Sequence, residues 1–441
     1  MLISVVAGFY LFVLPFLTGS GSSREQASCI DCNVILITID SIRQDHLGYM
    51  GYARDTSPAL DVVFTHAFSQ SSFTPPSLAS MMTSLYVSDH GLKKWGKLSD
   101  NHTTLAEVLA EAGYDTFAVT RVPKLFEQNL DQGFRETMQG NYWRADDFNN
   151  AALDWLDTRE DGKFFMWLHY YDPHRRYEPP APYDKKFNPL YRARRDVQRR
   201  DKNFFQNFWS GKINISKKHQ WDLITQYDGE IAYNDQQLGL LLGNLSERGL
   251  LEDTIVVISA DHGESLNEHP GKRKQMFVHD PLLFDTVVNI PLIFWGTSIP
   301  KGYEVGGLVE SIDIAPTILS IIGVNHSGIM QGRSLKPAIA GKEFHGKNEV
   351  YSECWGWEEL KMVRSKRYKY VRDIAKDKHV LYDLLRDPGE KHDVLKAEGK
   401  VAAEYGGLMD AFMTRHIHTP APESNLSEDL ERRLRELGYI Y

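Results

Sequence analysis

Short, uninterrupted runs of apolar and β-branched residues recur along the chain. The first is NVILITI at positions 33–39, and it ends abruptly at Asp40. Runs of the same kind stand at 116–120, 163–170, 254–260 and 291–296. A continuous apolar run of this length is typical of a parallel strand that is buried on both faces. The pattern therefore predicts a mostly parallel sheet.

Helical periodicity fills the intervals between these runs. The segment HTTLAEVLAEAG offers Thr103 as a candidate cap and ends at Gly113. In the stretch 219–245, apolar residues recur every three or four positions, as one face of a long helix requires. Strands that alternate with helices predict an α/β fold, in which helices sandwich a mostly parallel central sheet.

The pattern changes after about Gly332. The segments EVYSECW, ELKMVRS, RYKYVRD and KHVLYDL are short and strand-like, and charged turns separate them. This pattern predicts a small antiparallel sheet, with helices following at 401–415 and 428–437. We therefore expect a large α/β domain at 33–330 and a smaller C-terminal α+β subdomain at 331–441.

Composition adds a constraint on partners. The chain has 441 residues, 42% of them hydrophobic and 25% charged, with a formal net charge of -9. This mixture is that of an ordinary folded protein. Because no extended basic face accompanies the mild negative charge, a nucleic-acid partner is not expected, and a small molecule or an ester substrate is favoured.

The N-terminus differs from the rest of the chain. Residues 2–17 carry no charge and precede a small polar tract at 18–23, which predicts a signal peptide over 1–23. No Lys or Arg precedes the apolar run, so an uncleaved membrane anchor is the alternative. Either interpretation places the protein outside the cell, secreted or anchored. Glycosylation sequons agree with this at Asn101, Asn214, Asn244, Asn325 and Asn425.

Three cysteines are too few for a disulfide framework. Cys29 and Cys32 frame CIDC and could close a small loop, which leaves Cys354 unpaired. A redox-active CxxC is the alternative for this pair. A zinc site is not favoured, because neither a second cysteine pair nor a histidine cluster stands beside it.

Two of the expected strands end in an acidic residue. ITID ends in Asp40, and VVISADHGES reaches Asp261 and then His262. The carboxyl ends of strands in open α/β sheets are where ligands gather. Two carboxylates and an imidazole there would form a divalent-metal site. The alternative is that each Asp caps the turn after its strand.

Thr74 stands at the expected start of a helix. TPPSLASMMTSLY predicts a helix from Pro75 or Pro76, because proline is tolerated in the first turn, with Thr74 as its N-cap. A helix N-terminus also favours negative charge. If a metal at Asp40, Asp261 and His262 lay close by, the Thr74 hydroxyl could act as a nucleophile. The alternative role is capping alone.

The chain resembles the sulfatase family of the alkaline phosphatase superfamily from Asn33 to about Asp393. Segments that carry the resemblance, in order, are NVILITIDSIRQDHLGYMGY, SFTPPSLASMMTSLY, HTTLAEVLAEAGYDT, HYYDPHRRYEPP, YDGEIAYNDQQLG, VVISADHGESLNEH, NIPLIFWG, ESIDIAPTILSIIG, MQGRSLKPAI and LYDLLRDPGE. The resemblance implies an alkaline-phosphatase-like fold whose catalytic domain is the 33–330 unit.

The resemblance also implies roles for individual residues. Asp40, Asp261 and His262, together with Thr74, would bind one divalent cation, with calcium expected from the family and magnesium or manganese as alternatives. Thr74 falls at the nucleophile position. Two histidines that would hold the substrate anion or protonate the leaving group are His174 and His279, and His169 is a further candidate for substrate binding or a packed core residue.

Departures from the family pattern concern the nucleophile and its neighbours. Sulfatases convert a Cys or Ser to formylglycine, whereas this chain has Thr74, and Leu78 stands in place of an Arg. Ser41 replaces an acid, and Arg121 or Lys124 would substitute for a lysine after the second strand. Threonine at this position resembles instead the phosphotransferases and phosphodiesterases of the superfamily, which form a phospho-enzyme.

These features support three hypotheses. The favoured one is a metal-dependent hydrolase or transferase that acts on phosphate esters through Thr74, with His174 or His279 assisting the leaving group. The second is a sulfatase acting on sulfated glycans, and the third is a catalytically silent binding protein. Basic stretches at 190–205 and 271–274 would favour a polyanionic glycan or an anionic lipid headgroup if they border the site, and are otherwise solvated surface.

Overall fold

A computed structural model describes residues 27–56, 62–93, 96–192, 203–269, 272–355 and 358–416. The expected signal segment at 1–23, Asn425 and the expected helix at 428–437 lie outside these ranges. So do positions 193–202 and 271 of the two basic stretches.

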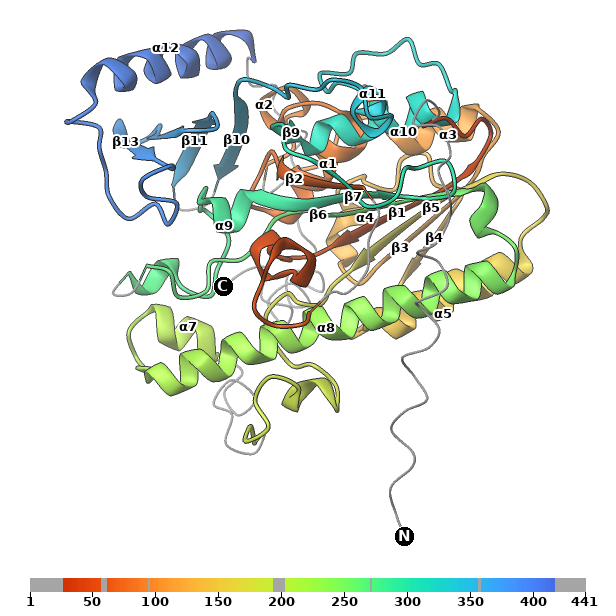
Figure 1. The fold of residues 1–441 in the computed structure, drawn as a ribbon, viewed down its shortest axis with the longest axis horizontal. Coiled ribbons are helices and arrows are strands. Elements are labelled where there is room, and N and C mark those ends of the chain that lie inside the picture. The colour runs from red at the N-terminus through yellow and green to blue at the C-terminus, as the bar shows by residue number, and fades with distance from the viewer. Residues whose placement is uncertain are drawn as a thin grey trace.

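A nine-stranded sheet forms the centre of the described structure (Figure 1). Its strands follow the order β4-β3-β5-β1-β6-β7-β2-β8. Strand β9 also pairs with β2, further along that strand than β8. The strands are β1 (Asn33–Ile39), β2 (Val62–Phe68), β3 (Asp115–Thr120), β4 (Glu136–Gln139), β5 (Phe164–Tyr170), β6 (Thr254–Ala260), β7 (Asn289–Trp295), β8 (Tyr303–Val305) and β9 (Val309–Glu310).

Strands β4, β3, β5, β1 and β6 run parallel to one another, which confirms the predicted mostly parallel sheet. The exception is β7, which pairs antiparallel with both β6 and β2. Strands β1, β5 and β6 are almost entirely buried, as their unbroken apolar runs require. The parallel arrangement brings the carboxyl ends of β3, β5, β1 and β6 to one edge of the sheet.

Helices cover both faces of the sheet. On one side lie α5 (Ala145–Thr158) and the long α8 (Lys217–Glu247), and on the other lie α1 (Thr74–Thr83), α3 (Leu105–Glu111), α10 (Ile314–Ile322) and α11 (Lys336–Ile339) (Figure 1). The short helices are α2 (Val87–His90), α4 (Pro123–Glu127), α7 (Phe204–Trp209) and α9 (Asp285–Val288). This arrangement is the predicted α/β sandwich.

A second, four-stranded antiparallel sheet lies at the C-terminal end (Figure 1). Its strands are β10 (Val350–Trp355), β11 (Glu359–Arg364), β12 (Tyr368–Asp373) and β13 (Lys378–Asp383), in that order. Helix α12 (Gly399–Arg415) packs Tyr405 and Met409 against Val363, Tyr370 and Leu381 of this sheet. The predicted small antiparallel sheet is therefore confirmed.

Two predicted helix starts are wrong by one residue. Helix α1 begins at Thr74 itself and takes Phe73 as its N-cap, because Phe73 keeps an extended backbone (φ -132°, ψ 136°). Helix α3 is capped by Thr104 rather than Thr103. The Thr104 side chain accepts a hydrogen bond from the Glu107 backbone, and the Glu107 side chain accepts one from the Thr104 backbone.

Cys29 and Cys32 form a disulfide immediately before β1, and Cys354 is a buried free thiol in β10. Among the described residues, no helix is long and apolar enough to cross a membrane.

A buried lysine joins the C-terminal sheet to the α/β domain. Lys369 of β12 is fully buried, and its Nζ lies 2.6 Å from Asp285 Oδ1 at the start of α9 and 2.7 Å from Glu390 Oε1. It also donates to the Leu283 carbonyl at 2.8 Å. Two carboxylates thus share one buried ammonium group, and Arg364 Nη2 also pairs with Asp285 Oδ2 at 2.9 Å.

We expect Lys369→Met to lower the free energy of unfolding by about 3 kcal/mol or more, because the buried Glu390 carboxylate loses its counter-charge and the partly buried Asp285 loses one of two. Lys378→Met removes the same charge from an exposed position at the start of β13 and should change stability little. Urea unfolding of both variants tests this, and equal midpoints would contradict it.

Candidate active site

Two aspartates meet at the carboxyl ends of β1 and β6. Ile39 pairs with Ala260 in the parallel register, so Asp40 and Asp261 follow at neighbouring positions, and both are fully buried. The Ser41 amide donates to Asp261 Oδ1 at 3.2 Å, and the Ser41 hydroxyl donates to Asp40 Oδ1 at 2.8 Å. Ligand atoms of Asp40, Asp261 and His169 all lie within 4.8 Å of one another.

His262 presents an unprotonated nitrogen to the same place. Its Nδ1 lies 2.9 Å from the Gly263 carbonyl, which can only accept, so Nδ1 carries the proton and Nε2 keeps a lone pair. That Nε2 lies 3.4 Å from Asp261 Oδ2 and 4.0 Å from Asp40 Oδ1. The turn needs a glycine after His262, because a Cβ on Gly263 would lie 2.3 Å from the Thr286 carbonyl oxygen.

Thr74 is brought to this cluster by helix α1. Its Oγ1 lies 3.2 Å from His262 Nε2, and the residue is fully buried. The helix is fastened to the strand end by Ser77, whose hydroxyl donates to the Asp261 carbonyl at 2.5 Å. The positive end of the α1 backbone dipole therefore faces the buried carboxylates.

The donor atoms fit a divalent cation. Asp261 Oδ2 and His169 Nε2 are buried and have no hydrogen-bond partner among the described residues. Burial raises the pKa of Asp261 to about 7, although hydrogen bonds, including one from Thr74, act to lower it. A cation would favour the ionised carboxylate again. Carboxylate oxygens with an imidazole nitrogen suit manganese, magnesium or calcium.

His169 lies closer to the metal cluster than expected. We predicted a substrate-binding or packing role, but its Nε2 is 3.9 Å from Asp40 Oδ2. Burial, and then His262, lower the pKa of His169 to about 3, so the ring is neutral. Its Nδ1 lies 2.9 Å from Thr38 Oγ1, and when Nδ1 donates there the Nε2 lone pair is available to a cation. Both His169 and His262 therefore border the candidate site.

The two predicted leaving-group histidines lie beside the same cluster. The ring of His279 stacks near that of His262, with centroids 4.1 Å apart, and the ring of His174 is 5.5 Å from that of His279. Burial, and then Arg175, hold the pKa of His174 well below its ordinary value. The structure thus places His279 beside His262, and His174 beside His279.

The two predicted cationic substitutes lie at different depths. Lys124 of α4 is 1% exposed, and its Nζ lies 5.8 Å from the ring centroid of Phe73, the residue before Thr74. Arg121, at the end of β3, is partly exposed and lies over the ring of Tyr171 at 4.0 Å. Lys124 is therefore the deeper of the two cations.

Two further residues of the site were not predicted from the sequence. Arg175 follows His174, is 7% exposed, and lies 4.9 Å from the ring centroid of Trp209. Glu264 is fully buried, with Oε1 3.5 Å from His279 Nδ1, and burial raises its pKa to about 8 despite the opposing charge of Arg175. Their place in the DPHRRY and DHGES segments was the only sequence signal for them.

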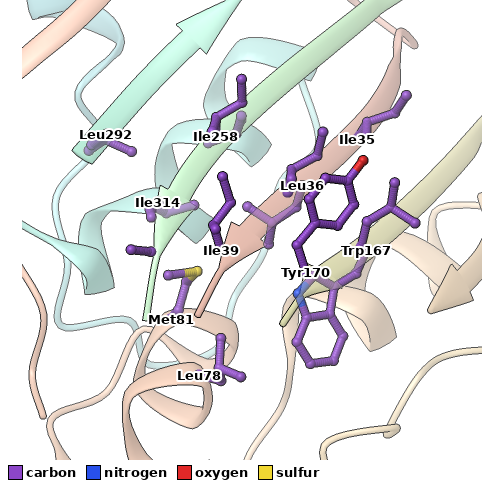
Figure 2. Packing of buried hydrophobic residues seen from close by; sticks show 14 of the residues in the cluster. Ile35, Leu36, Ile39, Leu78, Met81, Trp167, Tyr170, Ile258, Leu292 and Ile314 are labelled. Carbon is purple, nitrogen blue, oxygen red and sulfur yellow. The ribbon is translucent and has the colours of Figure 1, made fainter. Parts of the chain in front are cut away.

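Leu78 belongs to the core rather than to the site. It is fully buried, and Figure 2 shows it beside Met81 of α1, among the hydrophobic residues that include Ile39 at the end of β1. A cation at this position would have to be buried among apolar side chains.

Comparison with known proteins agrees with this geometry. The profile described as Sulfatase matches residues 32–324, which is about two-thirds of the chain, and a second, described as N-sulphoglucosamine sulphohydrolase, C-terminal, matches 275–406. The chain belongs to the sulfatase family. An arylsulfatase from Clostridium perfringens is 23% identical, over 83% of this chain and 90% of that protein.

Solved structures share the fold of this sulfatase-family hydrolase. A phosphonate monoester hydrolase from Agrobacterium radiobacter has a TM-score of 0.71 at 19% identity and covers 88% of this chain and 96% of its own. A protein solved with its substrate, D-glucosamine-2-N,6-O-disulfate, has a TM-score of 0.73 at 18% identity and covers 88% and 98%. At these identities the similarity supports the fold alone.

The candidate metal site predicts opposite effects of one substitution with and without a cation. The ordinary pKa of Asp261 is 3.8, and its pKa in the metal-free folded protein is about 7. Between pH 3.8 and pH 7 the folded protein therefore binds more protons than the unfolded chain. Its stability falls as pH rises through this range. Asp261→Asn should therefore raise the melting temperature of metal-stripped protein at pH 8.

The same variant should lose the rise in melting temperature that added Ca²⁺, Mg²⁺ or Mn²⁺ gives the unsubstituted protein. Asp253→Asn, an exposed aspartate just before β6, is the matched control and should keep that rise. A cation-induced rise that survives Asp261→Asn would contradict the assignment.

Proposed function

We propose that this sulfatase-family protein cleaves or transfers phosphate esters, with Thr74 as the nucleophile, one divalent cation at Asp40, Asp261 and His169, and His262 Nε2 as the acceptor of the Thr74 proton. The observation that carries the proposal is the 3.2 Å contact between Thr74 Oγ1 and the unprotonated Nε2 of His262, at the N-terminus of α1. A nucleophilic hydroxyl, a proton acceptor and a positive helix end meet there.

The chemistry of threonine favours phosphate over sulfate esters. Oxidation of its side-chain alcohol would give a ketone, which carries a methyl group and hydrates poorly, whereas the sulfatase reaction implied by the family uses a hydrated aldehyde. An unmodified threonine hydroxyl suits direct attack on phosphorus. The phosphonate ester specificity of one structural neighbour is consistent with this assignment.

In the proposed first step, the Thr74 Oγ1–H bond breaks and its proton passes to His262 Nε2. A bond forms between Oγ1 and phosphorus, and the bond from phosphorus to the leaving oxygen breaks. His279, held beside Glu264 at 3.5 Å, protonates that oxygen. The cation would supply charge stabilisation and orientation of the phosphoryl oxygens.

In the second step, the oxygen of water or of an acceptor alcohol attacks phosphorus, and the Thr74 Oγ1–phosphorus bond breaks. The attacking hydroxyl gives its proton to His279, and Oγ1 takes a proton back. Lys124 and Arg175 would supply positive charge to the transferred group, and the neutral ring of His174 would lie beside it. This charge is appropriate to an anionic ester of a glycan or a lipid headgroup.

A sulfatase acting on glycans is the second candidate. The C-terminal match to an N-sulphoglucosamine sulphohydrolase profile and the disulfated glucosamine bound by one structural neighbour favour it. A silent binding protein is less favoured, because the carboxylates, imidazoles and hydroxyl of the site are all present and convergent. We further propose that the N-terminal segment directs the protein outside the cell.

Thr74→Ala should reduce turnover of phosphate esters by at least about a thousand-fold, because no covalent intermediate can form. Thr83→Ala is the matched control, since Thr83 is a buried threonine of the same helix whose hydroxyl donates to the Ala79 carbonyl at 2.7 Å. Mass spectrometry of the peptide containing residue 74 after a substrate pulse should show added phosphate. Equal turnover by Thr74→Ala would overturn the proposal.

His279→Asn should slow esters with poor leaving groups by roughly a hundred-fold and affect nitrophenyl esters far less, because only the former need a proton from the enzyme. Steady-state kinetics over a series of leaving groups measures this difference. A uniform loss across the series would assign His279 to binding rather than to proton transfer.

A further inference from the structure

A row of aromatic rings and one guanidinium connects the nucleophile with the protein surface. From Thr74 the row passes through His262, then His279 with rings 4.1 Å apart, and then His174 at 5.5 Å. It continues to the ring of Tyr171, 4.8 Å from that of His174. Each member lies next to the following one, although these residues come from four different segments of the chain.

The row ends in a guanidinium between two tyrosine rings. Arg121 Cζ lies 4.0 Å from the ring centroid of Tyr171 and 5.7 Å from that of Tyr142. Arg121 Nη1 donates to the Trp143 carbonyl at 3.2 Å, and its Nε has no hydrogen-bond partner among the described residues. The guanidinium thus lies near both tyrosine rings and is held there by the Trp143 carbonyl.

The inner members of this row are buried, and exposure rises only at its outer end. Thr74 is fully buried, Tyr171 is 4% exposed, Arg121 is partly exposed, and Tyr142 is 68% exposed. The row therefore leads outward from the reacting hydroxyl and ends on a large ring that faces solvent.

The backbone holds Tyr142 in an unusual conformation. Tyr142 has a φ of 62°, in the left-handed region that is unfavourable for a tyrosine. The flanking turn is tightly packed, because a Cβ on Gly140 would lie 1.8 Å from Cδ2 of Trp143, and Trp143 packs edge-on against Phe148. Strain that presents an aromatic ring to solvent is the kind found at ligand contacts.

We propose that Tyr142 and Arg121 form a leaving-group subsite, which binds a sugar ring carried on the ester oxygen. The face of the tyrosine ring would stack on the apolar face of the sugar, and the guanidinium would donate to its hydroxyls. The inference rests on the proposed function for the location of the reacting ester, but not on whether that ester is a phosphate or a sulfate.

The competing explanation is that Arg121 and Tyr142 only stabilise the surface through a cation–π contact. The chain offers a matched example of such a pair, since Trp221 of α8 is 51% exposed and lies 4.4 Å from the guanidinium carbon of Arg54. That pair is not part of the row, so Trp221→Ala is the control.

The test compares two ligands of equal charge, methyl glucoside 6-phosphate and glycerol 3-phosphate, by calorimetric titration on a Thr74→Ala background that prevents turnover. We expect the ring-bearing ligand to bind more tightly, and Tyr142→Ala to reduce the ratio of the two affinities roughly three- to ten-fold. Tyr142→Phe should keep the ratio, because the stacking face remains, and Trp221→Ala should leave it unchanged.

An unchanged ratio in Tyr142→Ala would overturn the subsite, and so would a failure of both ligands to bind. The proposed function is tested separately, by turnover of phosphate and sulfate esters of the same sugar with the unsubstituted protein. If only the sulfate ester is cleaved while Tyr142→Ala still reduces the binding ratio, the subsite stands and the phosphoester assignment falls.

Discussion

The burial of two aspartates at neighbouring strand ends is the constraint on which the rest of the site depends. Asp40 and Asp261 have no exposed surface, and the Ser41 amide and hydroxyl link them. Two carboxylates so placed repel each other and lose their hydration, so a proton or a cation must compensate for them. The N-terminus of α1 and the lone pairs of His169 and His262 point to the place where that compensation is needed.

The geometry of this pair is maintained from outside the sheet. Ser41 has a φ of 61°, and the Tyr227 hydroxyl of α8 holds the turn by donating to the Ser41 carbonyl at 2.8 Å and accepting from the Arg43 amide at 2.9 Å. A long helix on one face thus fixes the loop after β1, while Ser77 on the other face fixes the end of β6. A slip of one residue between β1 and β6 would separate the carboxylates.

Much of the fold follows from local sequence, and its exceptions have physical reasons. The runs that form β1, β3, β5 and β6 are buried on both faces, so their uninterrupted apolar sequence identifies them as strands. The run of β7 also predicted a strand, but it did not predict the antiparallel direction. A strand that is buried on both faces has the same apolar pattern in either direction. Strand β2 was missed since Thr65 and His66 interrupt its apolar run, and β4 was missed because all four of its residues are exposed.

The site was predictable where chemistry coincides with a strand end or a helix start. Asp40, Asp261 and Thr74 were proposed in this way and lie close together in the structure, even though the start of α1 was placed one residue too late. Glu264 and Arg175 were not predicted. The neighbouring sequence does not indicate that the Glu264 carboxyl group will be buried or that Arg175 will be only 7% exposed beside a histidine. Their roles arise from packing between segments that are distant in sequence.

The position of Leu78 indicates where the positive charge of the site must come from. Because this residue lies in the core beneath β1, the helix that carries the proposed nucleophile Thr74 offers only its backbone dipole and no cationic side chain (Figure 2). The side-chain cations instead approach from the loops after β3 and β5, as Lys124 and Arg175. A transferred group would then be bound between the N-terminus of α1 on one side and the long side chains of Lys124 and Arg175 on the other. In the proposed mechanism, the residues that position Thr74 are therefore separate from those that would select the anion, so substitutions in the second set should alter the preferred ester without disturbing Thr74.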